Sequence, residues 1–99
     1  MAQRFSSQYL SYMNGPRWQA RRRRYYASYE RKCRACGSRQ DIQLHHVRYS
    51  RLGREPDRDL MPLCGSRCHP LVTRLTRMGV NWYLATWGVV ALGRLLRRT

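Results

Sequence analysis

Acidic residues are scarce in this chain of 99 residues, where five Asp and Glu stand against twenty Lys and Arg, giving a formal net charge of +15. Lysine is almost absent as well, because nineteen of the twenty basic residues are arginine. Positive charge at this density repels itself, so we expect a polyanionic partner. One arginine guanidinium can hydrogen-bond two phosphate oxygens at once and can stack on a base, which favours nucleic acid over a membrane surface. An acidic lipid, an acidic protein or a face that is merely solvated are the weaker alternatives.

Repeats, linkers and long apolar runs are also missing. No low-complexity segment or long run of Pro, Gly or Ser divides the sequence, which predicts one domain over residues 1–99. The apolar stretch near the C-terminus is too short to span a bilayer. The opening Met-Ala-Gln-Arg lacks the features of a secretory signal, so we expect a cytoplasmic, reducing location.

All four cysteines lie in two closely spaced pairs. Cys33 and Cys36 form the first pair, Cys64 and Cys68 form the second, and 27 residues separate the pairs. Two thiolate pairs at such spacings complete a tetrahedral site, which favours structural zinc, and in so small a chain the metal would contribute a sizeable share of the stability. Disulfides or free thiols are the alternative. His69 could also replace Cys64 or Cys68 as a ligand.

The hydrophobic pattern predicts an α+β fold. Strands are expected over residues 42–47 and 60–63, separated by a charged loop, and helices over 6–13, 16–31, 66–78 and 80–99, with Pro16 at a helix start and Gly79 at a helix end. This divides the chain into basic N-terminal helices (1–31), a zinc-stapled core (32–78) and an apolar, basic C-terminal helix (79–99). We expect that last helix to pack on residues 6–30, or to dock a protein partner; a helix lying on a membrane surface is a third option.

The helix over 16–31 carries both rings and charge. Its aromatic residues are expected to be core or helix-packing residues rather than surfaces that stack on bases: Trp18, Tyr25, Tyr26 and Tyr29. Its run of arginines is the better candidate for phosphate contact: Arg21, Arg22, Arg23 and Arg24. Further basic side chains end the chain at Arg94, Arg97 and Arg98, where they suit the helix dipole and extend the basic surface.

Several motifs occur in a fixed order around two adjacent histidines. They are Asn14-Gly15-Pro16-Arg17-Trp18, Leu44-His45-His46-Val47-Arg48-Tyr49, Gly53-Arg54-Glu55, Asp59-Leu60-Met61-Pro62-Leu63-Cys64 and Cys68-His69. Together, over roughly residues 10–75, they resemble the HNH endonuclease family in its cysteine-containing form. The resemblance implies a small ββα-metal (His-Me finger) core with a structural zinc site, flanked by helices. Such small proteins often occur in bacteriophage genomes near packaging genes, which implies a bacterial or phage-infected cell.

The resemblance also implies roles for individual residues. His46 would be the general base, and His45 and His69 would bind a catalytic divalent ion, for which magnesium or manganese is favoured and nickel, cobalt or zinc is admitted. Asp59 occupies the position that is usually asparagine, and Thr73 stands where some members have a further histidine, so the ligand set is sparse. Adjacent strand residues point in opposite directions, so His45 and His46 are not expected to bind one ion together.

Two of the remaining candidate residues, Glu55 and Asp59, have two interpretations each. Glu55 would orient His46 or hold the loop, or be an exposed loop carboxylate, and Asp59 would support the site or cap a turn. Arg48 and Tyr49 are placed to reach the substrate backbone.

These residues predict a metal-dependent DNA endonuclease that nicks one strand or cuts both with little sequence specificity. The alternative is a non-catalytic, zinc-stabilised nucleic-acid-binding module, or an adaptor for a larger nuclease or motor.

Overall fold

The computed structural model describes residues 7–97, in which helices and a two-stranded antiparallel sheet form the predicted α+β fold. The elements in chain order are α1 (Ser7–Met13), α2 (Pro16–Ser28), β1 (Ile42–His46), the 3₁₀ turn η1 (Asp57–Asp59), β2 (Leu60–Cys64), α3 (Cys68–Arg77) and α4 (Trp82–Arg97). Ser6, predicted as the first helical residue, and Arg98 and Thr99, predicted in the last helix, lie outside the described residues.

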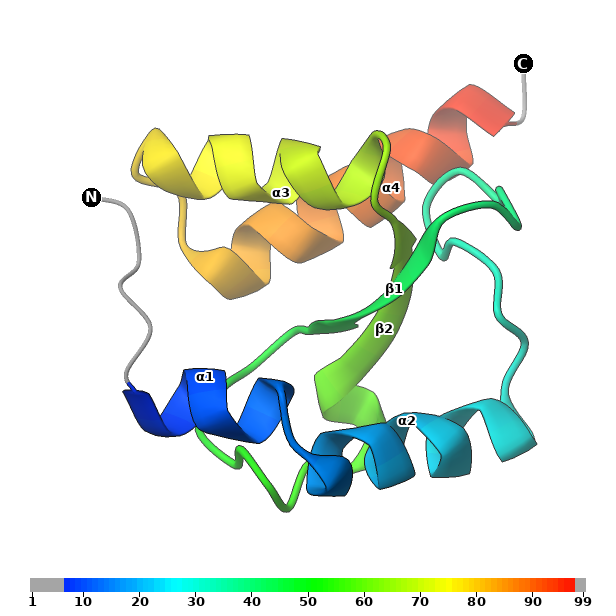
Figure 1. The fold of residues 1–99 in the computed structure, drawn as a ribbon. Helices are drawn as coiled ribbons and strands as arrows, with labels where there is room; N and C mark the ends of the chain where they lie inside the picture. The colour runs from blue at the N-terminus through cyan, green and yellow to red at the C-terminus, as the bar shows by residue number, and fades with distance from the viewer. Residues whose placement is uncertain (1–6, 98–99) are drawn as a thin grey trace.

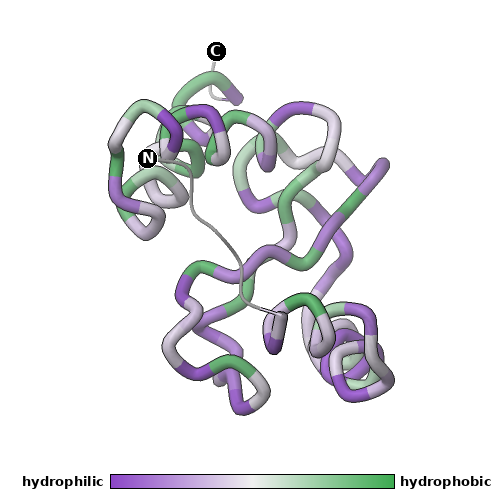
Figure 2. The backbone as a smooth tube through the Cα atoms, turned by 60° about the vertical axis from the view of Figure 1, so that its left-hand side comes forward, coloured by the Kyte–Doolittle hydropathy of each residue, from purple (hydrophilic) through white to green (hydrophobic). Residues whose placement is uncertain are grey.

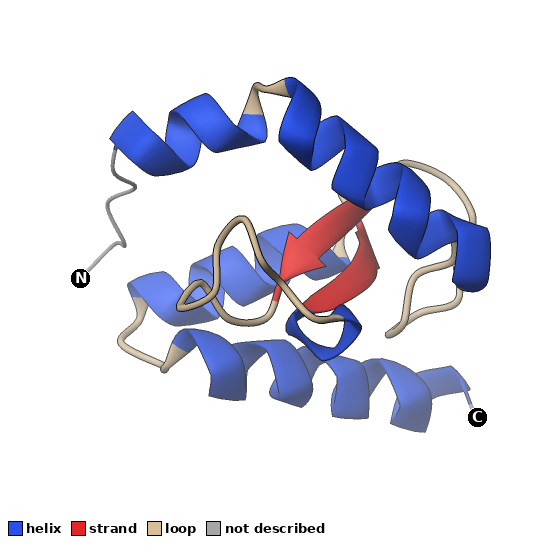
Figure 3. Ribbon diagram, turned by 90° about the horizontal axis from the view of Figure 1, so that it is seen from below, coloured by secondary structure: helices blue, strands red, loops and turns tan. Residues whose placement is uncertain are grey.

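The two strands lie between two pairs of helices (Figure 1). They pair antiparallel, from Ile42 opposite Cys64 to His46 opposite Leu60, with α1 and α2 on one side and α3 and α4 on the other (Figure 3). Both faces of the sheet are therefore covered, and Gln43 is the one exposed residue of the two strands. Because successive side chains on a strand point to opposite faces, neighbouring residues meet different helix pairs.

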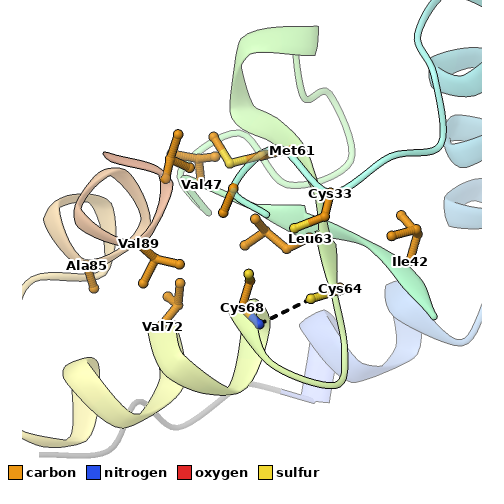
Figure 4. Packing of buried hydrophobic residues seen from close by; sticks show 12 residues of the cluster. Cys33, Ile42, Val47, Met61, Leu63, Cys64, Cys68, Val72, Ala85 and Val89 are labelled. Atoms are coloured by element: carbon orange, nitrogen blue, oxygen red, sulfur yellow. Dashed lines mark hydrogen bonds between the residues drawn. The ribbon is translucent and has the colours of Figure 1, made fainter. Parts of the chain in front are cut away.

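Each face of the sheet has its own hydrophobic core. On the α2 side, Trp18 and Tyr25 pack with Leu44 and Leu60. On the other side, buried residues from the sheet, the cysteine cluster, α3 and α4 pack together, as Figure 4 shows. This second core includes Val47, Met61, Leu63, Val72, Ala85, Val89 and Val90. Along the backbone, hydrophilic residues dominate α2, whereas hydrophobic residues are dense in α4 (Figure 2).

The C-terminal helix packs on α3 and not on residues 6–30, so that prediction is wrong. The reason is the short turn between α3 and α4. Gly79 adopts φ +99°, its N–H donates to the carbonyl of Thr76 (3.0 Å), and the N–H of Val80 donates to the carbonyl of Leu75 (3.1 Å). This left-handed cap ends α3 where predicted and folds α4 back beside it as a helical hairpin.

Two helix boundaries differ from the prediction because the cysteines shape the chain around them. The second helix ends at Ser28, three residues early, where Tyr29 takes an extended backbone that leads toward Cys33. The third helix begins at Cys68 rather than near residue 66, because the preceding turn brings the N–H of Cys68 to the sulfur of Cys64 (3.3 Å).

No helix within residues 7–97 is long and apolar enough to cross a membrane.

Gly93 of α4 lies against Ala35, between the cysteines of the first pair. A Cβ added to Gly93 would lie 2.5 Å from the carbonyl oxygen of Ala35, whereas one added to Gly88 in the same helix would meet nothing within 4 Å. Alanine favours a helix by about 1 kcal/mol over glycine, but overpacking against backbone costs about 1–3 kcal/mol. The clash therefore dominates at Gly93 and is absent at Gly88.

We expect Gly93→Ala to lower the thermal unfolding midpoint by roughly 10 °C, because α4 must shift away from Ala35. The matched variant Gly88→Ala should raise the midpoint by roughly 4–8 °C, since it gains helix propensity without a clash. Circular dichroism melts of both variants test the contact, and equal midpoints for the two variants would contradict it.

Candidate active site

The four cysteine sulfurs come together from three parts of the chain. Cys33 and Cys36 lie on the loop before β1, Cys64 ends β2 and Cys68 begins α3, and their sulfur atoms all lie within 4.8 Å of one another. Figure 4 shows Cys33, Cys64 and Cys68 within the hydrophobic core. The four are not joined in disulfides, and the cluster found among residues 7–97 contains no histidine, so His69 does not replace a cysteine there.

The spacing of these sulfurs fits a metal ion. Four sulfurs about 2.3 Å from one ion would be about 3.8 Å apart, and the sulfurs of Cys36 and Cys64 are 3.7 Å apart. Backbone N–H groups point at the sulfurs as they do at thiolates: that of Cys36 donates to Cys33 (3.5 Å) and that of Cys68 to Cys64 (3.3 Å). The cluster could therefore hold a structural metal such as zinc.

The thiols are too close to ionise independently. Burial raises the pKa of Cys64, but hydrogen bonds from the backbone N–H groups of Cys68 and Arg67 and from the side chains of Cys68 and Cys36 together lower it to about 6. Burial, together with hydrogen bonds to Cys33 and Cys64, raises the pKa of Cys68 above its ordinary value. A cation among the sulfurs would favour the thiolate form of the cluster.

The three histidines of the chain line one cleft of about 310 Å³. They reach it from β1 (His45 and His46) and from α3 (His69), while α1 and α2 form its opposite wall. Burial lowers the pKa of all three imidazoles below 6.5, most strongly at His45, where the charges of His69 and His46 add to the effect. All three are therefore neutral at pH 7 and have lone pairs to offer to a metal or a proton.

The hydrogen bonds of His45 assign its free nitrogen. Its Nε2 lies 2.9 Å from the hydroxyl of Thr86, and that hydroxyl donates to the carbonyl of Trp82 (2.9 Å). Thr86 therefore accepts from His45, which places the ring proton on Nε2 and the lone pair on Nδ1. Nδ1 is buried with no partner in the described structure, and the ring of His69 stands edge-on at 5.1 Å between centroids. These two imidazoles are side chains of the cleft that could contribute ligands to a cation.

His46 lies on the other face of β1, as the strand geometry predicts. Its Nε2 is 2.6 Å from the carboxylate of Glu55, and its ring is stacked between Trp18 (4.6 Å between centroids) and Tyr49 (5.2 Å). Glu55 is buried and also accepts from the hydroxyl of Tyr12 (2.9 Å), so it orients His46 rather than being an exposed loop residue. Burial raises the pKa of Glu55, but hydrogen bonds from His46, from its own backbone and from Tyr12 together lower it below its ordinary value. The carboxylate is therefore ionised.

The loop that carries Glu55 is held by arginines and by Asp59. The guanidinium of Arg21 donates to the carbonyl of Glu55 (3.0 Å) and to Asp57 (2.6 Å). Buried Asp59 accepts two bonds from Arg51 (2.7 and 2.9 Å), and its carbonyl accepts from the N–H of Val47 (2.7 Å). Asp59 therefore closes the loop and makes no hydrogen bond to His46 among those described.

The predicted phosphate-contacting residues divide into two groups. Arg21 is only 6% exposed and is bonded inside the protein, so its assignment as a phosphate contact is wrong. Arg22 lines the histidine cleft, Arg23 and Arg24 are exposed on α2, and Arg48 is exposed with its guanidinium 4.6 Å from the ring centre of Tyr83. Tyr49 lines the cleft and stacks on His46.

Sequence reasoning missed the contribution of α4 to this site. Thr86 fixes the tautomer of His45, and the indole N–H of Trp82 donates to the carbonyl of His46 (2.6 Å). The one local signal is Asn81, whose side chain caps the helix through the N–H groups of Tyr83 and Leu84. It marks where α4 begins but not what α4 touches.

Comparisons of the chain with protein-family models, with curated proteins and with solved structures found no match.

Removing the charge of Glu55 tests the electrostatics of His46. In Glu55→Gln the burial that lowers the pKa of His46 remains, but the carboxylate that raises it is lost, so the pKa should fall further below 6.5. Titration of the His46 ring by NMR measures both values. Because the unfolded chain takes up this proton near pH 6.5, the native state should lose stability as pH falls below 6.5 toward the native pKa.

Tyr12→Phe is the control, since it removes one hydrogen bond to Glu55 but keeps the charge, and it should leave the His46 pKa nearly unchanged. A wild-type pKa above 6.5 would show that Glu55 outweighs burial, contrary to this account.

Proposed function

We propose that this chain is a metal-dependent DNA endonuclease of the HNH type, with β1, β2 and α3 as its ββα-metal core. The observation that carries the proposal is the cleft that all three histidines line. One of them is paired with a buried carboxylate, and another has an unpartnered Nδ1 beside the third. Hydrolysis of a phosphodiester needs both kinds of group, a base for water and ligands for a cation.

In this proposal the four-cysteine cluster holds zinc, whose role is structural. The neighbouring histidines belong to a different cleft, so the cysteines fix the scaffold and leave the chemistry to the imidazoles. Elemental analysis of the purified chain should find one zinc per chain. Cys36→Ser should lower both the zinc content and the thermal midpoint, and a metal-free chain that is fully folded would contradict the assignment.

His45 and His69 would hold the catalytic divalent ion. When bound, that ion neutralises charge that develops on the phosphate and the leaving oxygen. Thr86 orients His45 for this task by accepting its Nε2 proton, as hydrogen-bond partners of metal-binding histidines commonly do. Thr73, whose hydroxyl bonds the carbonyl of His69 (3.3 Å), adds no imidazole, so water and substrate oxygens must complete the coordination.

His46 would take the proton of the attacking water. With Nε2–H donating to Glu55, the lone pair of His46 is on Nδ1, which can accept that proton. The carboxylate then stabilises the imidazolium that forms, and the rings of Trp18 and Tyr49 hold it in place. Arg22 in the cleft, with exposed Arg23, Arg24 and Arg48, supplies positive charge for the DNA backbone.

The proposal is tested by the nicking of supercoiled plasmid with magnesium, manganese or nickel. His46→Ala should lower the rate by about 10²–10⁴-fold, the usual contribution of a general base. The variant leaves a slot between Trp18 and Tyr49 in which a free imidazole fits, so imidazole added to the buffer should restore part of the activity.

Tyr83→Phe is the matched control, because it removes one hydroxyl from a partly exposed ring on α4 and should cut at the wild-type rate. Binding that is weakened by salt, with no cleavage in any of the three metals, would instead support the non-catalytic nucleic-acid-binding module. The sparse ligand set around His69 is the observation that favours this second function.

A further inference from the structure

A second cleft, of about 380 Å³, lies at the other end of α2 from the histidines. The end of α2, the first cysteine loop and the end of α4 meet there. The residues that matter for its chemistry are Tyr25, Tyr29, Lys32, Arg34, Arg94 and Arg97. None of them takes part in the histidine site.

Four cations line this cleft without a matching negative charge. Within residues 7–97, no ion pair involves Lys32, Arg34, Arg94 or Arg97. The one carboxylate that lines the cleft, Glu30, is bound by Arg39 at 2.8 Å. Like charges held together repel, so the cleft is suited to an anion that more than one of them can contact.

The scaffold fixes these cations rather than leaving them on mobile segments. Arg34 lies between Cys33 and Cys36, and its N–H donates to the carbonyl of Pro62 (2.9 Å). The close contact of Gly93 with Ala35 holds the end of α4 against the same loop, which places Arg94 beside it. The side chain of Arg97 crosses over Gly37, where a Cβ would lie 2.9 Å from its Nη1.

Tyr29 adds an aromatic surface next to this charge. One face of its ring stacks on buried Tyr25, with 4.6 Å between centroids and 25° between planes. The neighbouring Asp57 raises the pKa of its hydroxyl, and 46% of the residue is exposed. A ring that is anchored on one face, and open to solvent elsewhere, can stack on an unpaired base. Of the two interpretations expected for these rings, Tyr25 is a core residue, whereas Tyr29 is not in the core and packs on the helix through Tyr25.

We propose that this second cleft binds a single-stranded segment of DNA, with phosphates on Arg34, Arg94 and Arg97 and a base stacked on Tyr29. A duplex does not offer a free base face, so the ring selects an unpaired strand. Tyr29, which follows α2, stands seven residues after Arg22 and eleven residues after Trp18, and both of these line the histidine cleft. Along a helix these separations correspond to about 10–16 Å. That distance is about three to five nucleotides of a stacked strand. The proposal rests on the proposed function in that the bound strand would be the one that continues into the histidine cleft.

The test is binding of a single-stranded oligonucleotide that contains 2-aminopurine, and of its blunt duplex, to the full chain without added divalent metal. Wild-type protein should quench the probe in the single strand by stacking. Tyr29→Leu should lose the quenching and bind the single strand about tenfold more weakly, while Tyr29→Phe should keep both. The duplex should be affected by neither variant.

The charge is tested separately. Arg94→Gln with Arg97→Gln should reduce the slope of log affinity against log salt by about 1.4 for the single strand, since each phosphate contact contributes about 0.7. Arg74→Gln with Arg77→Gln is the matched control, because these exposed arginines end α3 as the others end α4. Equal slopes for the two double variants, or equal effects of Tyr29→Leu on duplex and single strand, would overturn the proposal.

Circular dichroism melts should show each variant folded under the binding conditions. The plasmid assay keeps the two proposals apart. A chain that stacks the probe but cuts no plasmid supports this cleft and refutes the nuclease, whereas a chain that cuts plasmid but shows no Tyr29-dependent stacking does the reverse.

Discussion

The convergence of four sulfurs within 4.8 Å is the constraint on which the arrangement of the whole molecule depends. It ties the loop before β1 to the end of β2 and the start of α3, which lie beyond the 27 residues that separate the two cysteine pairs. Ala35, inside the first cysteine pair, is in turn the contact surface for Gly93 of α4. The two small hydrophobic cores must offset the self-repulsion of a chain with a charge of +15. A cation bound by the four thiolates would therefore contribute a large part of the free energy of folding.

The two-stranded sheet sets the positions of two of the histidines on this scaffold. His45 and His46 are adjacent in sequence, but their side chains point to opposite faces of the sheet. Because both faces are covered, the two histidines lie in different surroundings. His45 meets Thr86 and His69 on the α3 and α4 side, and His46 meets Glu55 and two aromatic rings on the α1 and α2 side. In the proposed function, this separation would give the two imidazoles the two roles that phosphodiester hydrolysis requires, without competition for one ion.

Arginine serves two purposes that composition alone does not distinguish. Arg17, Arg21 and Arg51 donate to carbonyls or carboxylates of the loop before β2 and thereby hold Glu55 in place. Others are exposed around the two clefts, where their charge is available to a polyanion. The five acidic residues are too few to pair with twenty basic ones, so most of the positive charge stays unpaired. The density of charge indicates the class of partner, and the fold decides which side chains can reach it.

Sequence patterns alone predicted the helices and strands to within a few residues, the grouping of the cysteines and the opposite directions of His45 and His46. These depend on local spacing: Pro16 at a helix start, Gly79 at a left-handed cap and the two-residue period of a strand. The folded structure was needed to see that α4 packs on α3, that Arg21 is an internal residue and that Thr86 and Trp82 touch the histidines. The contacts of Arg21, Thr86 and Trp82 join residues 34 to 41 positions apart, and no local pattern carries the energy of such long-range packing.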